Sequence, residues 1–292
     1  MARGRKPSPL RRAGIIRGQD RTRWTDFYHA ILTVPWPVFL LALAVFFVAL
    51  NAVFALAYMA DPNGIANARP GNFWDAFRFS VQTVASIGYG VLSPKSDYAN
   101  IVAVAEAFAG ILNLALITGI VFSRFSRPTA RVLFSEVAVI TPYDGVPTLM
   151  FRATNQRGNR ILDANITVSF ARQWVSREGI AMRRIDELKL VRSRSSLFAL
   201  SWTVMHPIDQ ESPLYGQTRE SLAGMEAELV ALLSGTDETL AAMIFARHSF
   251  KPQQIRWNHR FVDVLGFTPK GRRVVDLKRF HDTEADASPY GE

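Results

Sequence analysis

The chain has 292 residues, of which 49% are hydrophobic and none is cysteine. This length allows one large domain or two modest ones. The lack of cysteine excludes disulfides and thiolate metal sites but leaves the redox compartment open. The hydrophobic fraction suits a chain with one part in a membrane and another part in water.

The net charge of +9 is spread unevenly along the chain. Residues 1–33 hold eight Lys/Arg and two Asp, residues 34–123 hold three Lys/Arg and four acids, and residues 124–292 hold 23 and 19. A nucleic-acid-binding protein would concentrate its basic residues on a folded module with interleaved aromatics. Here the excess flanks a central apolar region on both sides. The charge therefore indicates membrane topology and no nucleic-acid partner.

Two short segments precede the apolar region. Residues 1–22 are basic and nearly free of apolar side chains, and we expect them to be flexible. They are not a secretory signal, because the apolar run starts too late and is too long. Residues 23–33 predict an amphipathic helix lying in the membrane interface, with a helix packed on a soluble domain as the alternative. Its apolar face comprises Trp24, Phe27, Tyr28 and Ile31.

Two segments are long and apolar enough to span a membrane. The first, residues 35–58, is uncharged, and at ~1.5 Å per residue it exceeds the ~30 Å hydrocarbon core. The second, residues 100–123, contains Glu106 and Asn113. Basic residues flank the outer sides of both spans, whereas residues 60–99 carry no net charge. The positive-inside rule therefore predicts a multi-pass protein of the inner (plasma) membrane with both termini in the cytoplasm.

Between the spans, residues 73–85 predict a helix too short to cross, with Asn72 as its N-cap. The sequence Ser86-Ile87-Gly88-Tyr89-Gly90 follows directly. In potassium channels, four loops of this type aim backbone carbonyls at the ion in place of its water shell. Such aiming requires positive φ angles, which glycine adopts at little cost. We therefore predict a re-entrant pore helix and a K+ filter, with an ordinary glycine-rich turn as the alternative.

From Val132 onward the apolar pattern changes to a period of two. One run comprises Ile166, Val168 and Phe170, and a second comprises Phe198, Leu200, Trp202 and Val204. Turn signals such as Asp144-Gly145 recur between the runs. The pattern is typical of an immunoglobulin-like β-sandwich. We expect this all-β domain over residues 128–292, after a transmembrane α-helical pore domain over residues 34–127.

An enzyme is not expected, because no nucleophile–base pair, phosphate loop or metal cluster stands out in the sequence. The alternative from another class is a membrane-anchored binding module with the β-sandwich as its working part. A helical hairpin would suffice for anchoring, so that alternative leaves the 86–90 loop and the polar Asn113 unexplained.

Two spans, a Ser-Ile-Gly-Tyr-Gly loop and a β-sandwich together resemble the inward-rectifier potassium channel family, most closely its bacterial branch. The supporting stretches are residues 36–39, 124–128, 201–209 and 212–215. The resemblance covers about residues 23–282. It implies a homotetramer with one central pore, a permeant K+ and no cofactor. A less selective cation channel is the alternative, since Ser86 stands where most family members have Thr.

The resemblance also implies roles for single residues. The carbonyls of Ser86, Ile87, Gly88 and Tyr89 would face the ion, with Gly90 completing the filter loop. Phe122 would close the path as one of four apolar rings, although a lipid-facing Phe is the alternative. The cavity position at which strong rectifiers carry an acid is Leu114, beside the uncharged Asn113. Block by magnesium or polyamines should therefore be weak.

Charged residues in and after the second span complete the set. Glu106 is costly inside a membrane, and we expect a buried structural acid, protonated or hydrogen-bonded to the short helix near Thr83. Arg124, Arg127 and Arg131 are plain topology charges or, as the resemblance implies, a site for anionic phospholipid such as phosphoinositide. Gly110 and Gly119 either let the second span bend or permit close helix packing.

Overall fold

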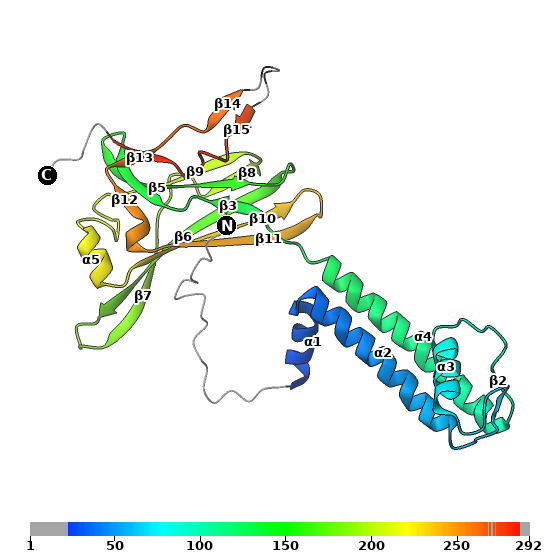
Figure 1. The fold of residues 1–292 in the computed structure, drawn as a ribbon. Coiled ribbons are helices and arrows are strands. Elements are labelled where there is room, and N and C mark those ends of the chain that lie inside the picture. Colours follow the sequence, from blue (N-terminus) through cyan, green and yellow to red (C-terminus); the bar gives the residue numbers. More distant parts are fainter. Residues whose placement is uncertain (1–22, 268, 270, 272, 287–292) are drawn as a thin grey trace. The chain divides into compact units, whose positions relative to one another are not determined.

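The computed structural model describes residues 23–267, 269, 271 and 273–286. The basic segment predicted to be flexible, residues 1–22, lies outside these residues. The described chain forms two compact units that meet in sequence between Arg127 and Pro128. The first contains helices α1–α4 and the second contains strands β3–β16 (Figure 1).

Helices α1 and α2 follow each other almost without a break. Helix α1 covers Arg23–Thr33 and α2 covers Trp36–Tyr58. Pro35 stands at the N-cap of α2 and Pro37 lies in its first turn, where a missing N–H costs least. Helix α2 is long and apolar enough to cross a membrane, so the first predicted span is confirmed.

Helix α4, Asp97–Phe125, is the second candidate span. It begins three residues before the predicted start, because the Ser96 side chain caps it by accepting a hydrogen bond from Ala99 N at 3.1 Å. The loop after α2 and the loop before α4 are joined by a short antiparallel pair of strands, β1 (Ile65–Ala66) and β2 (Ser93–Pro94).

Helix α3, Phe73–Val84, is the predicted short helix. The Asn72 side chain accepts a hydrogen bond from Asp75 N at 3.1 Å, as its predicted N-cap role requires. The buried face of α3 joins a hydrophobic cluster to which both long helices contribute. Its buried members are Ala55, Tyr58, Ile65, Ala76, Phe79 and Ala99.

The second unit contains two five-stranded sheets. One has the order β11-β10-β6-β7, with β8 also paired to β6. Its strands are β6 (Ile161–Val175), β7 (Ala181–Glu187), β8 (Arg194–Phe198), β10 (Glu228–Asp237) and β11 (Ala242–Phe250). The other has the order β12-β4-β5-β3, with β9 also paired to β5. Its strands are β3 (Val132–Phe134), β4 (Ala138–Tyr143), β5 (Val146–Asn155), β9 (Ser201–Pro207) and β12 (Ile255–Trp257).

Smaller elements complete this unit. Strand β13 (His259–Phe261) pairs with β16 (Thr283–Ala285), and β14 (Leu265–Phe267) pairs with β15 (Arg273–Val275). Helix α5 covers Arg219–Gly224 and a 3-10 turn, η2, covers Pro252–Gln254. Among the described residues, all strand pairs are antiparallel except β12 with β4.

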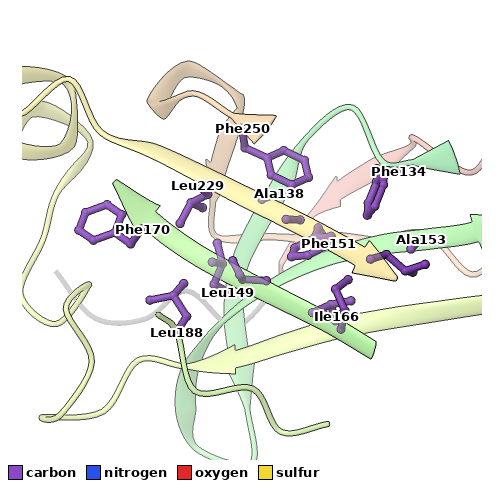
Figure 2. Packing of buried hydrophobic residues seen from close by; sticks show 14 of the residues in the cluster. Phe134, Ala138, Leu149, Phe151, Ala153, Ile166, Phe170, Leu188, Leu229 and Phe250 are labelled. Carbon is purple, nitrogen blue, oxygen red and sulfur yellow. The ribbon is translucent and has the colours of Figure 1, made fainter. Parts of the chain in front are cut away.

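One hydrophobic core lies between the two sheets (Figure 2). Leu149 and Phe151 of β5 meet Ile166 and Phe170 of β6 there. The predicted period of two in β6 is confirmed, because Ile166, Val168 and Phe170 are all buried. The β-sandwich is therefore the observed fold of the second unit.

The second predicted alternation, over residues 198–204, does not form one strand. Phe198 ends β8 in one sheet and Trp202 belongs to β9 in the other. Leu200 lies between them, is 39% exposed, and offers its carbonyl to the Thr154 hydroxyl at 2.6 Å. The crossing between sheets turns the chain over, so Leu200 leaves the core although its position in the pattern placed it there.

Candidate functional site

Ser86 terminates α3 with a specific backbone motif. Its φ is +53°, its N–H donates to Thr83 O at 3.1 Å, and Ile87 N–H donates to Gln82 O at 2.8 Å. This pair of bonds around a left-handed residue is a Schellman motif. A left-handed conformation costs a non-glycine residue about 1–2 kcal/mol. The motif turns the chain sharply out of the helix at the first residue of the predicted filter.

Left-handed backbone then recurs at every second residue. The φ angles of Ser86, Gly88 and Gly90 are +53°, +57° and +80°. The two residues between them, Ile87 and Tyr89, do not have a positive φ. In a regular strand successive groups alternate between two sides. Alternating the sign of φ instead lets successive carbonyls point to one side, which is what ion coordination requires. The two glycines were predicted from the sequence, but the positive φ of Ser86 was not.

The carboxyl group of Glu106 lies at the meeting point of three helices. Glu106 is fully buried, and its Oε2 accepts a hydrogen bond from the Tyr58 hydroxyl of α2 at 2.7 Å. Its Oε1 is hydrogen-bonded to Ser80 Oγ of α3, which lies 3.0 Å from Asn51 Oδ1 of α2. The sequence analysis predicted that the α3 partner of Glu106 would lie near Thr83, which is about one helical turn after Ser80. The Thr83 hydroxyl instead donates to Phe79 O within its own helix, at 2.9 Å.

Gly110 lies one turn after Glu106 on the same side of α4. A Cβ at this position would come within 2.8 Å of Val84 O, the carbonyl of the last α3 residue. Gly110 therefore permits close packing of α4 against the end of α3. Gly119 has nothing within 4 Å of a built Cβ. Of the two functions considered for these glycines, close packing accounts for Gly110 alone.

The three predicted pore-lining residues of α4 do not share one face. At 100° per residue, Leu114 lies about 80° around the helix from Phe122, whereas Asn113 lies about 180° away. Phe122 and Leu114 are 71% and 67% exposed in the single chain, and Asn113 is partly buried. The helix thus brings Leu114 and Phe122 to one broad exposed side and turns Asn113 away from it.

Arg124 holds the end of α1 against the end of α4. Its guanidinium donates to Val34 O at 2.6 Å and also to Ile31 O, and it lies over the Trp36 and Phe39 rings at 4.8 and 4.5 Å. The last carbonyls of a helix lack intrahelical partners, and Arg124 supplies donors to this end. No local pattern in the sequence predicts these contacts, because they join residues 90 or more positions apart.

The other two arginines are more open to solvent. Arg127 is exposed and donates to Leu32 O at 3.2 Å. The exposed Arg131 belongs to the second unit, where its backbone carbonyl accepts a hydrogen bond from Gln156 N at 2.8 Å. The three basic residues grouped by the sequence therefore have different surroundings.

A buried acid of the second unit anchors the chain just after Pro128. Asp237 is 1% exposed and accepts hydrogen bonds from Arg157 Nη1 at 3.1 Å and Asn159 Nδ2 at 2.9 Å. Burial alone would raise the pKa of the Asp237 carboxyl, but its hydrogen bonds from side chains and backbone lower that pKa below the usual range. Arg157 Nη2 also donates to Thr129 Oγ1 at 2.9 Å. Sequence reasoning missed this cluster, since its members come from three distant segments.

The chain matches two family descriptions and several known proteins. Residues 132–290 match the inward rectifier potassium channel C-terminal domain, and residues 36–127 match an ion channel family. The chain is 46% identical to the inward rectifier potassium channel Kirbac3.1 of Paramagnetospirillum magnetotacticum, over 95% of this chain and 96% of that protein. It is 29% identical to the ATP-sensitive inward rectifier potassium channel 12 of Mus musculus, over 90% of this chain and 67% of that protein.

Proposed function

Since the chain belongs to the inward-rectifier potassium channel family, we propose that four copies assemble around one pore and that residues 86–90 of each copy bind K+ there. The observation that carries the proposal is the alternation of positive φ at Ser86, Gly88 and Gly90. Such an alternation lets carbonyls point to one side of the segment, and four such segments around an axis would surround a dehydrated ion with oxygens. Potassium transport needs no further cofactor in this scheme.

The position of α3 supports the same role. Its C-terminal end carries the partial negative charge of the helix dipole and leads directly into Ser86. In the proposed tetramer four such ends would favour a cation at the inner end of the filter. Ile87 and Tyr89 are 44% and 71% exposed in the single chain, and neighbouring copies would cover them.

We place the gate of the proposed pore at Phe122. An exposed aromatic ring near the end of α4, on the side that Leu114 also faces, would form an apolar neck when four copies meet. Such a neck passes ions only when it is wide enough to hold water. Leu114 carries no charge, so the cavity should bind blocking cations weakly.

We assign anionic lipid to Arg127 and Arg131 and give Arg124 a different task. A basic side chain next to a span attracts an anionic surface by about 1 kcal/mol. The guanidinium of Arg124 is already committed to the backbone of residues 31 and 34. Bound lipid is expected to inhibit conduction. The membrane is the inner (plasma) membrane, with both termini on the cytoplasmic side where basic residues accumulate.

The test is rubidium uptake into liposomes that contain only this protein. A K+ gradient should drive uptake of the tracer, and replacing internal K+ with Na+ should abolish it. A well-folded oligomer without uptake would favour the alternative of a membrane-anchored binding module. Uptake that Na+ drives equally well would favour a non-selective cation channel.

A further inference from the structure

The buried contacts around Glu106 form a chain of polar atoms whose protons can be counted. Four contacts run in sequence from Tyr58 Oη to Glu106, to Ser80 Oγ, to Asn51 Oδ1, and from Asn51 Nδ2 to Phe47 O. Tyr58 is 2% exposed, and Asn51, Ser80 and Glu106 are fully buried. Each contact needs one proton between its two heavy atoms, since two oxygens at this distance otherwise repel.

The amide of Asn51 fixes one end of the count. Phe47 O can only accept, so the atom 2.7 Å from it must be the Nδ2 donor, and Oδ1 then faces Ser80. Turning the amide over would place Oδ1 against Phe47 O and leave that contact without a proton. Ser80 has a single hydroxyl proton and two oxygen neighbours, Asn51 Oδ1 and Glu106 Oε1. Because Asn51 Oδ1 carries no proton, the Ser80 hydroxyl must donate its proton to that atom.

A proton on Glu106 completes the chain. With Ser80 donating to Asn51 Oδ1, the bond between Glu106 Oε1 and Ser80 Oγ needs its proton from the carboxyl group. Tyr58 then donates to Oε2, and every contact holds one proton. An ionised Glu106 would leave one contact empty and would bury a charge with no cationic partner among the described side chains.

We propose that Glu106 is a neutral carboxylic acid and that it positions the filter by donating its proton to Ser80 on the pore helix. The chain of bonds ties α3 to α2 and α4 at once, six residues before Ser86 begins the filter. Gly110 seats the end of the same helix against α4 one turn further on. The effect on the filter rests on the proposed function, whereas the proton on Glu106 does not.

The proton is tested directly by infrared difference spectroscopy on the full chain in lipid. The spectrum of the wild type minus that of Glu106→Gln should contain a carbonyl band of a protonated carboxylic acid at neutral pH. A difference spectrum with only carboxylate bands overturns the proposal. This measurement needs no ion flux, so a wild type that conducts nothing would defeat the proposed function and leave the band in place.

The positioning role is tested by substitutions with matched chemistry. Glu106→Gln keeps one donor and one acceptor in the same places, so flux and the preference for K+ over Na+ should stay within about twofold of the wild type. Ser80→Ala removes one proton and two bonds, and the K+ preference should fall by about fivefold or more. Thr83→Val removes a hydroxyl that bonds only within α3 and is the control. Equal selectivity in Ser80→Ala and Thr83→Val, or loss of selectivity in Glu106→Gln, overturns the positioning role.

Discussion

At Gly88 the backbone conformation, and not the available space, limits what can replace the residue. A Cβ there would meet nothing within 4 Å, but φ is +57°. Gly88→Ala should add about 1–2 kcal/mol of strain in each copy and shift the carbonyls, so rubidium flux should fall at least tenfold while the oligomer stays intact. Size-exclusion chromatography and liposome flux check both parts.

Gly158→Ala is the matched control for this change, because it adds the same methyl in open space between β5 and β6, where φ is not positive. Its flux should match that of the wild type. Flux at the wild-type level in Gly88→Ala would remove residues 86–90 from the filter role.

The buried side chain of His206 should make the stability of the second unit depend on pH. Its Nδ1 donates to Lys189 O and its Nε2 lies within hydrogen-bond distance of the Ser212 hydroxyl, both at 2.7 Å, and the neutral ring can accept a hydrogen bond from that hydroxyl. Burial lowers the pKa of His206 below its ordinary value of 6.5. Between the folded and unfolded pKa values the unfolded state binds more protons, so stability is full above about pH 6.5 and declines as the pH falls below it.

Thermal unfolding of the protein measured from pH 8 down to pH 5 checks this slope. The decline should be smaller in His206→Gln, and it should be unchanged in His29→Gln, which alters an exposed histidine of α1. An identical decline in wild type and His206→Gln would show that other groups cause it.

Helix α4 carries the proposed gate, Phe122, in its last turn. Phe122→Ala should widen the apolar neck and raise rubidium flux several-fold, because a wider neck holds water. A neck held open also leaves lipid little to control, so this variant should respond weakly to phosphoinositide. Leu112→Ala, at another exposed apolar position on α4, tests whether any truncation has the same effect. A full lipid response in Phe122→Ala would mean that lipid acts elsewhere.

The contacts of Arg124 with the end of α1 predict that this residue and the pair Arg127 and Arg131 have different roles. Replacing Arg127 and Arg131 with Gln should make flux insensitive to added phosphoinositide. Arg124→Gln instead removes donors from the end of α1, so basal flux should change while the lipid response persists. Rubidium uptake with and without the lipid distinguishes the two outcomes. Loss of the lipid response in Arg124→Gln alone would place the lipid at that residue instead.

Across the whole molecule, the sequence predicted those features that depend on near neighbours. The two spans follow from long, largely apolar runs, α3 from Asn72 and its short apolar face, and β6 from its period of two. Contacts between distant segments were not predictable in the same way. The sequence missed Ser80 as the partner of Glu106 by about one helical turn, because the position of one helix along another is set by their packing. The contacts of Arg124 were missed because they depend on where α1 ends.

The two hydrophobic clusters found among the described residues have no residue in common. One contains buried residues from Ala55 to Ala99, and the other contains buried residues from Phe134 to Ile255. Cooperative melting requires a continuous packed core, so each part should melt as its own unit. Calorimetry should therefore record two heat-absorption peaks. Changing the detergent or lipid should move one peak, and acidification through the His206 range should move the other.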